Sequence, residues 1–304
     1  MAKRKSGRDV HGILLLDKRL GVSSNKALQE VRRLFNANKA GHTGSLDPLA
    51  TGLLPLCFGE ATKVSALMLD DDKRYQVVVR LGVMTDTGDA EGQVVKQLPV
   101  PELTEQQIQD CLRHFTGEIE QVPPMYSALK HQGKKLYELA REGKVVDRKT
   151  RRITIFSLRL LGVVAGDCLS LDVQCSKGTY IRSLAEDIGH YLGCCATVKA
   201  LRRTASGRFG IDQALTLEQL TAMDETALQH SLIAVDKPLE SMPAVQVPSD
   251  QAERIRQGQQ IAIDVPARGM VRMYCDQVFL GLGEMLLNGK IAPKKLFHLS
   301  SESA

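Results

Sequence analysis

The chain has 304 residues and a net charge of only +5, with 43% hydrophobic and 25% charged residues. This composition is ordinary for a globular protein, and the length allows one large domain plus a small one. No apolar run reaches membrane-spanning length, and the apolar stretch after the basic N-terminus is too short for a signal peptide, so we expect a cytoplasmic protein with no membrane partner. The seven cysteines form no C-x-x-C pair and no metal-ligand spacing with the seven histidines, which is typical of reduced, buried thiols.

The first part of the chain alternates predicted strands and helices after a basic tail at residues 1–10. Continuous apolar runs indicate buried strands, and Ser23 or Ser24 is suited to cap the helix after the first of them. In one predicted strand apolar and polar residues alternate, which places Tyr75, Val77, Val79 and Leu81 on a single face. The predicted strands are at 12–18, 53–59 and 73–82, and the predicted helices are at 23–36 and 60–69.

The middle of the chain continues this alternation. The acids of the loop at 84–92 lack the D-x-[DN]-x-[DN]-G pattern of a Ca²⁺ loop, so we expect the loop to be solvated. A helix at 104–117 is indicated by Thr104 and Gln107 as a capping box and by Gly117 as its end. Two alternating strands, 151–164 and 168–178, lead into a helix at 179–193. These spacings favour an α+β sheet over regular βαβ winding.

The composition changes near residues 234–248, which are rich in proline and predict a linker. Short predicted strands follow at 269–275, 277–283 and 284–292, and Asn288-Gly289 in the last is a strong hairpin-turn signal. We therefore expect a large domain at 11–240 and a small β-rich domain at 245–304.

Positive charge is concentrated in one segment. Between Tyr126 and Arg152 there are nine Lys or Arg and three acids, a local net charge of +6 that exceeds the +5 of the whole chain. A basic segment on a near-neutral body is what binding to a phosphate backbone requires, although a solvated basic surface has the same pattern.

The stretch AGHTGSLDPLATGLLP, residues 40–55, surrounds the single acid Asp47 with three glycines and two prolines. The following proline pushes the Asp47 backbone into the extended region, and the glycines permit close approach of another backbone or a flat ligand. Ordinary turn chemistry is the alternative explanation of Leu-Asp-Pro. Arg182 falls in the first turn of a predicted helix, where the helix dipole disfavours a cation, so a compensating carboxylate would explain it. Paired with Arg182, Asp47 would stay ionised inside a pocket.

Several motifs of known nucleotide-binding or metal-dependent sites are absent from the sequence. It has no G-x-x-x-x-G-K-[ST] loop, no G-x-G-x-x-G, and no H-x-E with P-C-x-x-C. If the chain is an enzyme, we expect it to work without a nucleotide cofactor or a metal. Tyr75 and Tyr180 lie at the edges of predicted elements, where each is either core filler or a plate on which a base could stack.

Motifs distributed in order over residues 9 to about 210 resemble the bacterial TruB-type tRNA pseudouridine synthases. They are GRDVHGILLLDK, AGHTGSLDPLATGLLP, GEATK, DKRYQVVVRLG, TDTGDAEG, PPMYSALKHQGKKLYELAREG, CSKGTYIRSLAEDIG and LRRTASGRF. One departure is DKRLG, where the family usually has Asp-Lys-Pro. The resemblance implies a catalytic domain with a mixed, largely antiparallel sheet flanked by helices, and a small β-barrel PUA-like C-terminal domain.

The resemblance also implies roles for individual residues. Asp47 is expected to be the catalytic aspartate and Arg182 its ion-pair partner, with Tyr75, Tyr180 and Leu201 around the target base. His42 would fill the gap that the flipped uridine leaves in the tRNA T-loop. Residues 123–152 would form a mobile thumb that clamps the T-arm. The cations that we expect to meet the RNA backbone are Lys130, Lys134, Lys135 and Arg141.

The implied reaction converts uridine 55 of the T-loop to pseudouridine, which needs no cofactor because nothing enters or leaves. Asp47 acts either as a nucleophile or as the base that removes the 2′ proton, and the sequence does not choose between them. The expected substrate is the tRNA T-arm, possibly with the acceptor end bound by the C-terminal domain, and we expect a monomer. Two rival interpretations are a non-catalytic RNA-binding protein and a synthase with a different RNA target.

Overall fold

The computed structural model describes residues 7–164, 166–266 and 268–299. A large sheet has the strand order β1-β3-β12-β4-β11-β10-β7, with β2 beside β3 and β13 beside β12. The β12–β3 pair is parallel and the other pairs of this sheet are antiparallel. The predicted α+β class, with a mixed and largely antiparallel sheet, is confirmed. The expected tail at 1–10 lies mostly outside the described residues.

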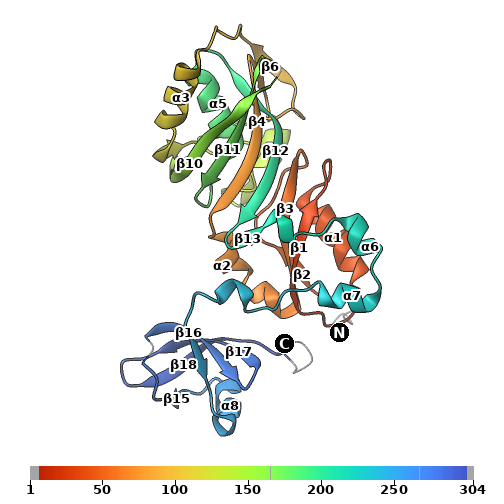
Figure 1. Cartoon of the computed structure of the whole chain (residues 1–304), viewed down its shortest axis with the longest axis vertical. Coiled ribbons are helices and arrows are strands. Elements are labelled where there is room, and N and C mark those ends of the chain that lie inside the picture. Colours follow the sequence, from red (N-terminus) through yellow and green to blue (C-terminus); the bar gives the residue numbers. More distant parts are fainter. Residues whose placement is uncertain (1–6, 165, 267, 300–304) are drawn as a thin grey trace.

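Figure 1 labels the main elements of the chain. The strands of the large sheet are β1 (Gly12–Lys18), β2 (Ala40–His42), β3 (Ala50–Phe58), β4 (Lys73–Leu81), β7 (Gly117–Gln121), β10 (Arg151–Val164), β11 (Cys168–Cys175), β12 (Ala196–Ser206) and β13 (Phe209–Gly210). The helices are α1 (Ser24–Leu34), α2 (Ser65–Leu69), α3 (Glu105–His114), α4 (Leu136–Arg141), α5 (Ile181–Tyr191), α6 (Leu217–Thr221), α7 (Glu225–His230) and α8 (Ser249–Arg256). Short 3₁₀ turns are η1 (Gly59–Lys63), η2 (Ile211–Gln213) and η3 (Lys237–Leu239), and small hairpins are β5 (Val83–Thr85) with β6 (Val94–Gln97) and β8 (Lys130–His131) with β9 (Lys134–Lys135).

The first strand carries an unbroken apolar run at 13–16 because both of its faces are covered. Leu14 and Leu16 belong to the main core beneath α1 and α5, whereas Ile13 and Leu15 pack in a second cluster on the opposite side. Strand β4 instead alternates buried and more exposed residues, with the predicted face inward. Both predictions from the hydrophobic pattern are confirmed.

The predicted N-terminal ends of two helices are confirmed, whereas α3 ends at His114, three residues before the predicted Gly117, which instead begins β7. Ser23 is the N-cap of α1, and Thr104 and Gln107 form the capping box of α3. The single helix expected over 60–69 is wrong, because the chain forms η1 and then the short α2. Thr62 and Ser65 donate side-chain hydrogen bonds to carbonyls three residues earlier, which competes with regular helical bonding.

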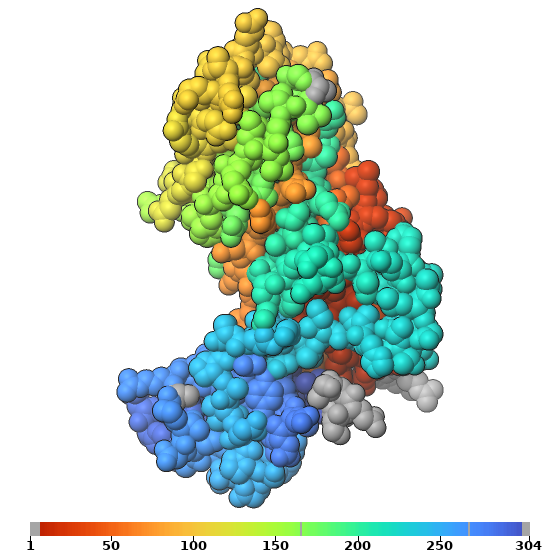
Figure 2. Space-filling model, in the orientation of Figure 1, coloured from red at the N-terminus to blue at the C-terminus, as the bar shows by residue number. Residues whose placement is uncertain are grey.

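The C-terminal part forms a curled sheet of five strands in the order β14-β16-β17-β18-β15. They are β14 (Ala244–Gln246), β15 (Ile261–Ala262), β16 (Gly269–Cys275), β17 (Val278–Met285) and β18 (Lys290–Leu296). The Asn288-Gly289 turn is confirmed between β17 and β18. The strand expected at 277–283 extends to Met285 as β17, and the segment expected at 284–292 is divided between the end of β17, the turn and the start of β18. Phe279 and Phe297 pack with Ile13 and Leu53 of the large sheet, and Figure 2 shows the two parts in contact.

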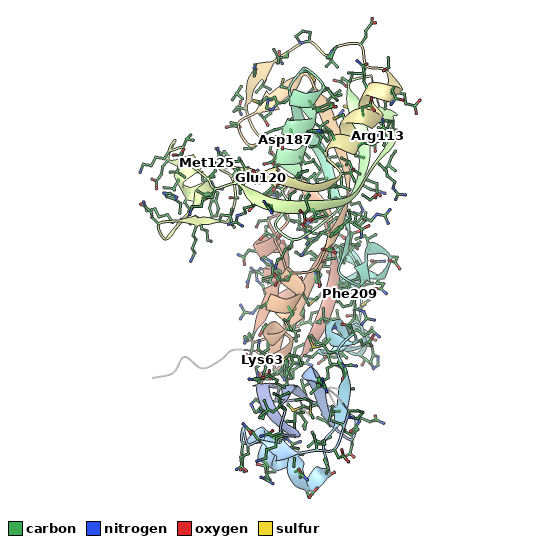
Figure 3. All side chains as sticks on the ribbon, turned by 90° about the vertical axis from the view of Figure 1, so that its left-hand side faces the viewer. Lys63, Arg113, Glu120, Met125, Asp187 and Phe209 are labelled. Atoms are coloured by element: carbon green, nitrogen blue, oxygen red, sulfur yellow. The ribbon has the colours of Figure 1, made fainter. Side chains whose placement is uncertain are left out.

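A third part leaves the large sheet between β7 and β10. It contains β8, β9 and α4, and Figure 3 shows it projecting sideways near Met125, away from the sheet. We call residues 122–150 the thumb. No helix in the described ranges is long and apolar enough to cross a membrane.

Candidate active site

A pocket of about 840 Å³ opens between the large sheet, the loop after β2 and the thumb. Six residues predicted from the sequence to serve the reaction at the flipped uridine line it together, although they come from four separate stretches of the chain. They are His42, Asp47, Tyr75, Tyr180, Arg182 and Leu201. Of the four predicted thumb cations, Lys135 and Arg141 also line the pocket. Lys130 and Lys134 lie on the adjoining β8–β9 hairpin with exposed side chains.

The loop that carries Asp47 is held in place by hydrogen bonds from buried polar side chains. The Ser24 hydroxyl accepts a hydrogen bond from Leu46 N–H at 2.7 Å and donates one to the Leu46 carbonyl at 2.9 Å. The Lys18 ammonium donates to the carbonyls of Val22 at 2.7 Å and Pro48 at 3.4 Å. Enclosure lowers the pKa of Lys18 to about 8, while the charge of Asp47 opposes that change. The sequence prediction considered Ser24 only as a helix cap and missed Lys18.

Close backbone approach is visible at Gly52, two residues beyond the loop. A Cβ there would lie 2.3 Å from the carbonyl oxygen of Arg203, and Gly52 has a φ of +99°. Only glycine therefore allows β12 to pair with β3 at this point, which brings Leu201 beside Ala50 at the edge of the pocket.

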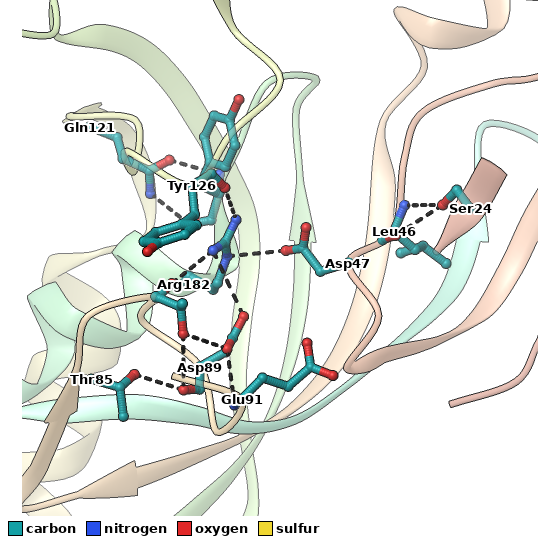
Figure 4. A network of polar contacts seen from close by, with 11 residues as sticks. Ser24, Leu46, Asp47, Thr85, Asp89, Glu91, Gln121, Tyr126 and Arg182 are labelled. Atoms are coloured by element: carbon teal, nitrogen blue, oxygen red, sulfur yellow. Dashed lines mark hydrogen bonds and ion pairs between the residues drawn. The ribbon is translucent and has the colours of Figure 1, made fainter. Parts of the chain in front are cut away.

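Asp47 and Arg182 are in contact. The Arg182 Nε atom lies 3.1 Å from Asp47 Oδ2, and the arginine side chain is only 6% exposed whereas that of Asp47 is 44% exposed. The carboxylate thus faces the pocket with a buried cation behind it (Figure 4). Enclosure raises the pKa of Asp47, Arg182 and Lys18 oppose this, and Asp89 adds to it.

Arg182 is held by more than the aspartate. Its Nη1 donates to the Thr87 carbonyl at 2.7 Å, its Nη2 donates to the Tyr126 carbonyl at 2.6 Å, and Asp89 Oδ2 lies 3.8 Å from Nη1. Asp89 is buried and accepts from Thr87 Oγ1 and Glu91 N–H. The expectation that the loop at 84–92 is solvated is therefore wrong for Asp89, which turns inward because a buried cation needs a second anion.

The two tyrosines lie on different walls of the pocket. Tyr75 is buried on β4, and Tyr180 is the half-buried residue just before α5. Burial raises the pKa of both phenols, so both are neutral near pH 7. At another part of the wall, burial and the charge of Arg203 lower the pKa of His42, which favours a neutral imidazole ring. Its Nδ1 is buried without a hydrogen-bond partner among the described residues.

The thumb brings cations to the rim of the pocket. Lys135 Nζ and the Arg141 guanidinium carbon each lie 5.4 Å from the ring centre of Tyr137, which also lines the pocket. Lys134 lies 3.7 Å from Glu142, an exposed pair of small energetic weight. Within the ranges that the structure covers, no group of His, Cys, Asp or Glu is arranged to hold a metal ion.

Comparison with known proteins identifies the family. Residues 32–181 match the model for the TruB family pseudouridylate synthase N-terminal domain, and residues 182–242 and 243–297 match two C-terminal models of the same synthases. The tRNA pseudouridine synthase B of Chromohalobacter salexigens is 53% identical over 304 residues, covering 99% of both chains. The chain belongs to the TruB family of pseudouridylate synthases. The enzyme of the same name from Nitrosococcus oceani is 51% identical, covering 98% of each chain.

Solved structures share the TruB-type fold. A chain of a Cbf5-Nop10-Gar1 complex matches with a TM-score of 0.71 at 25% identity, covering 95% of this chain and 85% of that one. A chain of an H/ACA RNP bound to a substrate RNA containing 2′-deoxyuridine matches with a TM-score of 0.70 at 22% identity, covering 98% and 92%.

The departure from the usual TruB pattern at DKRLG has a local explanation. Arg19, where proline is usual, pairs with Glu30 of α1 at 2.9 Å, and Gly21 N–H donates to the Pro48 carbonyl at 2.9 Å. The turn therefore stays attached both to α1 and to the Asp47 loop.

Proposed function

We propose that this chain is a tRNA pseudouridine synthase that isomerises uridine 55 in the T-loop, with Asp47 as the catalytic residue. The observation that carries this proposal is the half-exposed Asp47 carboxylate, held at 3.1 Å by the buried Arg182 in a pocket large enough for a nucleoside. Family membership supports the reaction class. The aromatic rings of Tyr75 and Tyr180 in the pocket wall support a flat ligand such as uracil, and the cations of the lining support a phosphate backbone next to it.

The reaction breaks the N1–C1′ bond, turns the uracil and rejoins it to the sugar through C5. The proton on C5 leaves and N1 gains one, so the product is an isomer and no cofactor is consumed. Asp47 either attacks C1′ to give a covalent intermediate or removes the 2′ proton to give a glycal. Both routes require an ionised carboxylate beside the sugar and a pocket that keeps the detached base close.

The uridine must leave its stack to reach Asp47, which costs a few kcal/mol. A base–aromatic stacking contact returns about 1–3 kcal/mol, and Tyr75 and Tyr180 are placed to supply such contacts. Leu201 would close the pocket around the base. His42, whose pKa is lowered toward the neutral ring, would occupy the vacated position in the T-loop without adding charge.

Binding of the T-arm is assigned to the thumb through Lys130, Lys134, Lys135 and Arg141. The PUA-like C-terminal sheet would reach the acceptor end of the tRNA. We expect a monomer. We assign the protein to the cytoplasm because its substrate is there.

Pseudouridine mapping tests the proposal. An unmodified tRNA transcript is incubated with the purified protein, and the modified positions are read by carbodiimide labelling and reverse transcription. Modification at position 55 is expected. Tight tRNA binding with no pseudouridine would support the non-catalytic rival, and modification only of another RNA would support a different target.

A further inference from the structure

Gln121 is a buried amide at the neck of the thumb. It is the last residue of β7, its partner on β10 is Arg151, and the thumb begins at the next residue. Only 3% of Gln121 is exposed to solvent, whereas every other residue of β7 is more exposed. A buried side-chain amide must satisfy both its donor and its acceptor, so its partners are informative.

Both partners of Gln121 belong to the backbone of Tyr180. Gln121 Oε1 accepts from Tyr180 N–H at 2.8 Å, and Gln121 Nε2 donates to the Tyr180 carbonyl at 3.0 Å (Figure 4). Tyr180 is the residue before α5 and supplies no side-chain cap to that helix. The Gln121 amide therefore fixes the entry of the chain into α5 from a distant strand.

The same helical turn contacts the thumb at two further points. Ser183 Oγ donates to the Val122 carbonyl at 3.0 Å, and Arg182 Nη2 donates to the Tyr126 carbonyl at 2.6 Å. Arg182 also holds Asp47 through Nε. One turn of helix thus connects the first limb of the thumb to the carboxylate, and Gln121 is the buried group that sets where that turn begins.

We propose that Gln121 is a positioning residue for the isomerisation, which holds Tyr180 and the first turn of α5 in register with Asp47 at the point where the thumb leaves the sheet. This inference rests on the proposed function. Gln121 is not among the residues that line the pocket, so it acts through Tyr180 and Arg182, which are. Loss of its two hydrogen bonds should slow the chemical step while phosphate contacts elsewhere preserve affinity.

The test is Gln121→Met, which keeps the length of the side chain and removes both hydrogen bonds. The expected result is a single-turnover rate of pseudouridine formation at least about tenfold below wild type, because small displacements of reacting groups are costly. The Kd for tRNA should stay within about threefold. Gln107→Met is the matched control, since it removes a glutamine-to-backbone hydrogen bond at the capping box of α3. It should keep the wild-type rate.

Circular dichroism melting identifies variants that do not fold. If Gln121→Met is unfolded, Gln121→Glu replaces it, because Glu keeps an acceptor for Tyr180 N–H and has no N–H for the Tyr180 carbonyl. A folded Gln121 variant with the wild-type rate, or one that loses tRNA affinity alone, overturns the inference and leaves the proposed function intact. An inactive wild-type enzyme overturns the proposed function, and this inference with it.

Discussion

The chemistry of Asp47 depends on opposing influences within a few ångströms. Enclosure in the pocket raises the pKa of Asp47 and disfavours its charge, and Arg182 at 3.1 Å is the main group that restores it. The carboxylate faces the pocket while the arginine is buried. The charge that the proposed reaction requires of Asp47 is therefore maintained by a largely buried cation at the wall of the pocket.

Replacing Asp47 by Asn tests its role directly. The amide is the same size but is neither a nucleophile nor a base at neutral pH, so pseudouridine formation should fall below detection. Affinity for tRNA should stay within a few fold, because phosphate contacts dominate binding. Rates are followed by tritium release from [5-³H]uridine-labelled tRNA and affinity by filter binding. Measurable turnover by the pure variant would show that another residue performs the reaction.

The decrease in rate on the acid side of the pH–rate profile should follow the protonation of Asp47. Activity requires the ionised form, so the single-turnover rate should be full above the raised pKa of Asp47 and fall as the pH drops through it. Asp89 contributes to that rise, and Asp89→Asn should therefore move the midpoint of the acid limb to lower pH. The measurement uses saturating tRNA at each pH. A midpoint unchanged in Asp89→Asn, or moved to higher pH, contradicts this account of the site.

At the residue scale, the sequence predicted the groups whose chemical type is unusual for their position. Asp47 stood out among glycines and prolines, and Arg182 stood out as a cation in a first helical turn. Asp89 and Gln121 gave no such signal, because an acid in a Gly-rich loop and a glutamine at a strand end are ordinary. Their importance comes from burial against α5, which depends on how distant segments pack.

At the scale of elements, the thumb is the part to which we assign an electrostatic task, the binding of RNA phosphates. Each phosphate contact contributes about 0.7–0.9 to the slope of log affinity against log salt, so replacing four contacts should reduce the slope by about 3. The variant for this test carries Lys130→Ala, Lys134→Ala, Lys135→Ala and Arg141→Ala. Filter binding over a range of KCl concentrations measures the slope.

A comparison with cations outside the thumb makes the thumb result specific. Lys96 lies on β6, and Arg113 lies on α3, away from the thumb in Figure 3. Replacing both by Ala removes positive charge without touching the thumb and should leave the slope unchanged. An equal slope for the wild-type protein and the fourfold thumb variant would mean that this segment is only a solvated basic surface.

Most elements were predictable because their patterns are local. The alternation in β4 and the capping box of α3 each depend on a few consecutive residues. The interruption of the expected helix by η1 could not be predicted in this way. Thr62 and Ser65 form side-chain hydrogen bonds to the backbone that helix propensity does not describe. Likewise, the boundary predicted between residues 283 and 284 is absent, because β17 continues to Met285 before the turn.

For the whole molecule, the arrangement predicts recognition of a folded RNA. The thumb projects beside the pocket, and the C-terminal sheet is packed against the base of the large sheet through Phe279 and Phe297 (Figures 2 and 3). If the pocket receives a single flipped nucleoside, as we propose, selection must come from the shape of the stem and loop around it. Proteins generally recognise RNA by shape together with unstacked bases, and flipping is easiest where a base already lies in a loop.

The most direct test of this account compares initial rates of pseudouridine formation on small RNAs. A T-arm hairpin of about 17 nucleotides should react nearly as fast as whole tRNA, with uridine 55 as the modified position. A hairpin with a different but fully paired stem should also react, while the same loop sequence in an unstructured strand should not. Equal rates on the hairpin and on the unstructured strand would contradict recognition by shape. No reaction on the hairpin, with normal reaction on whole tRNA, would contradict the claim that the thumb and pocket suffice and would show that the C-terminal domain must hold the acceptor end.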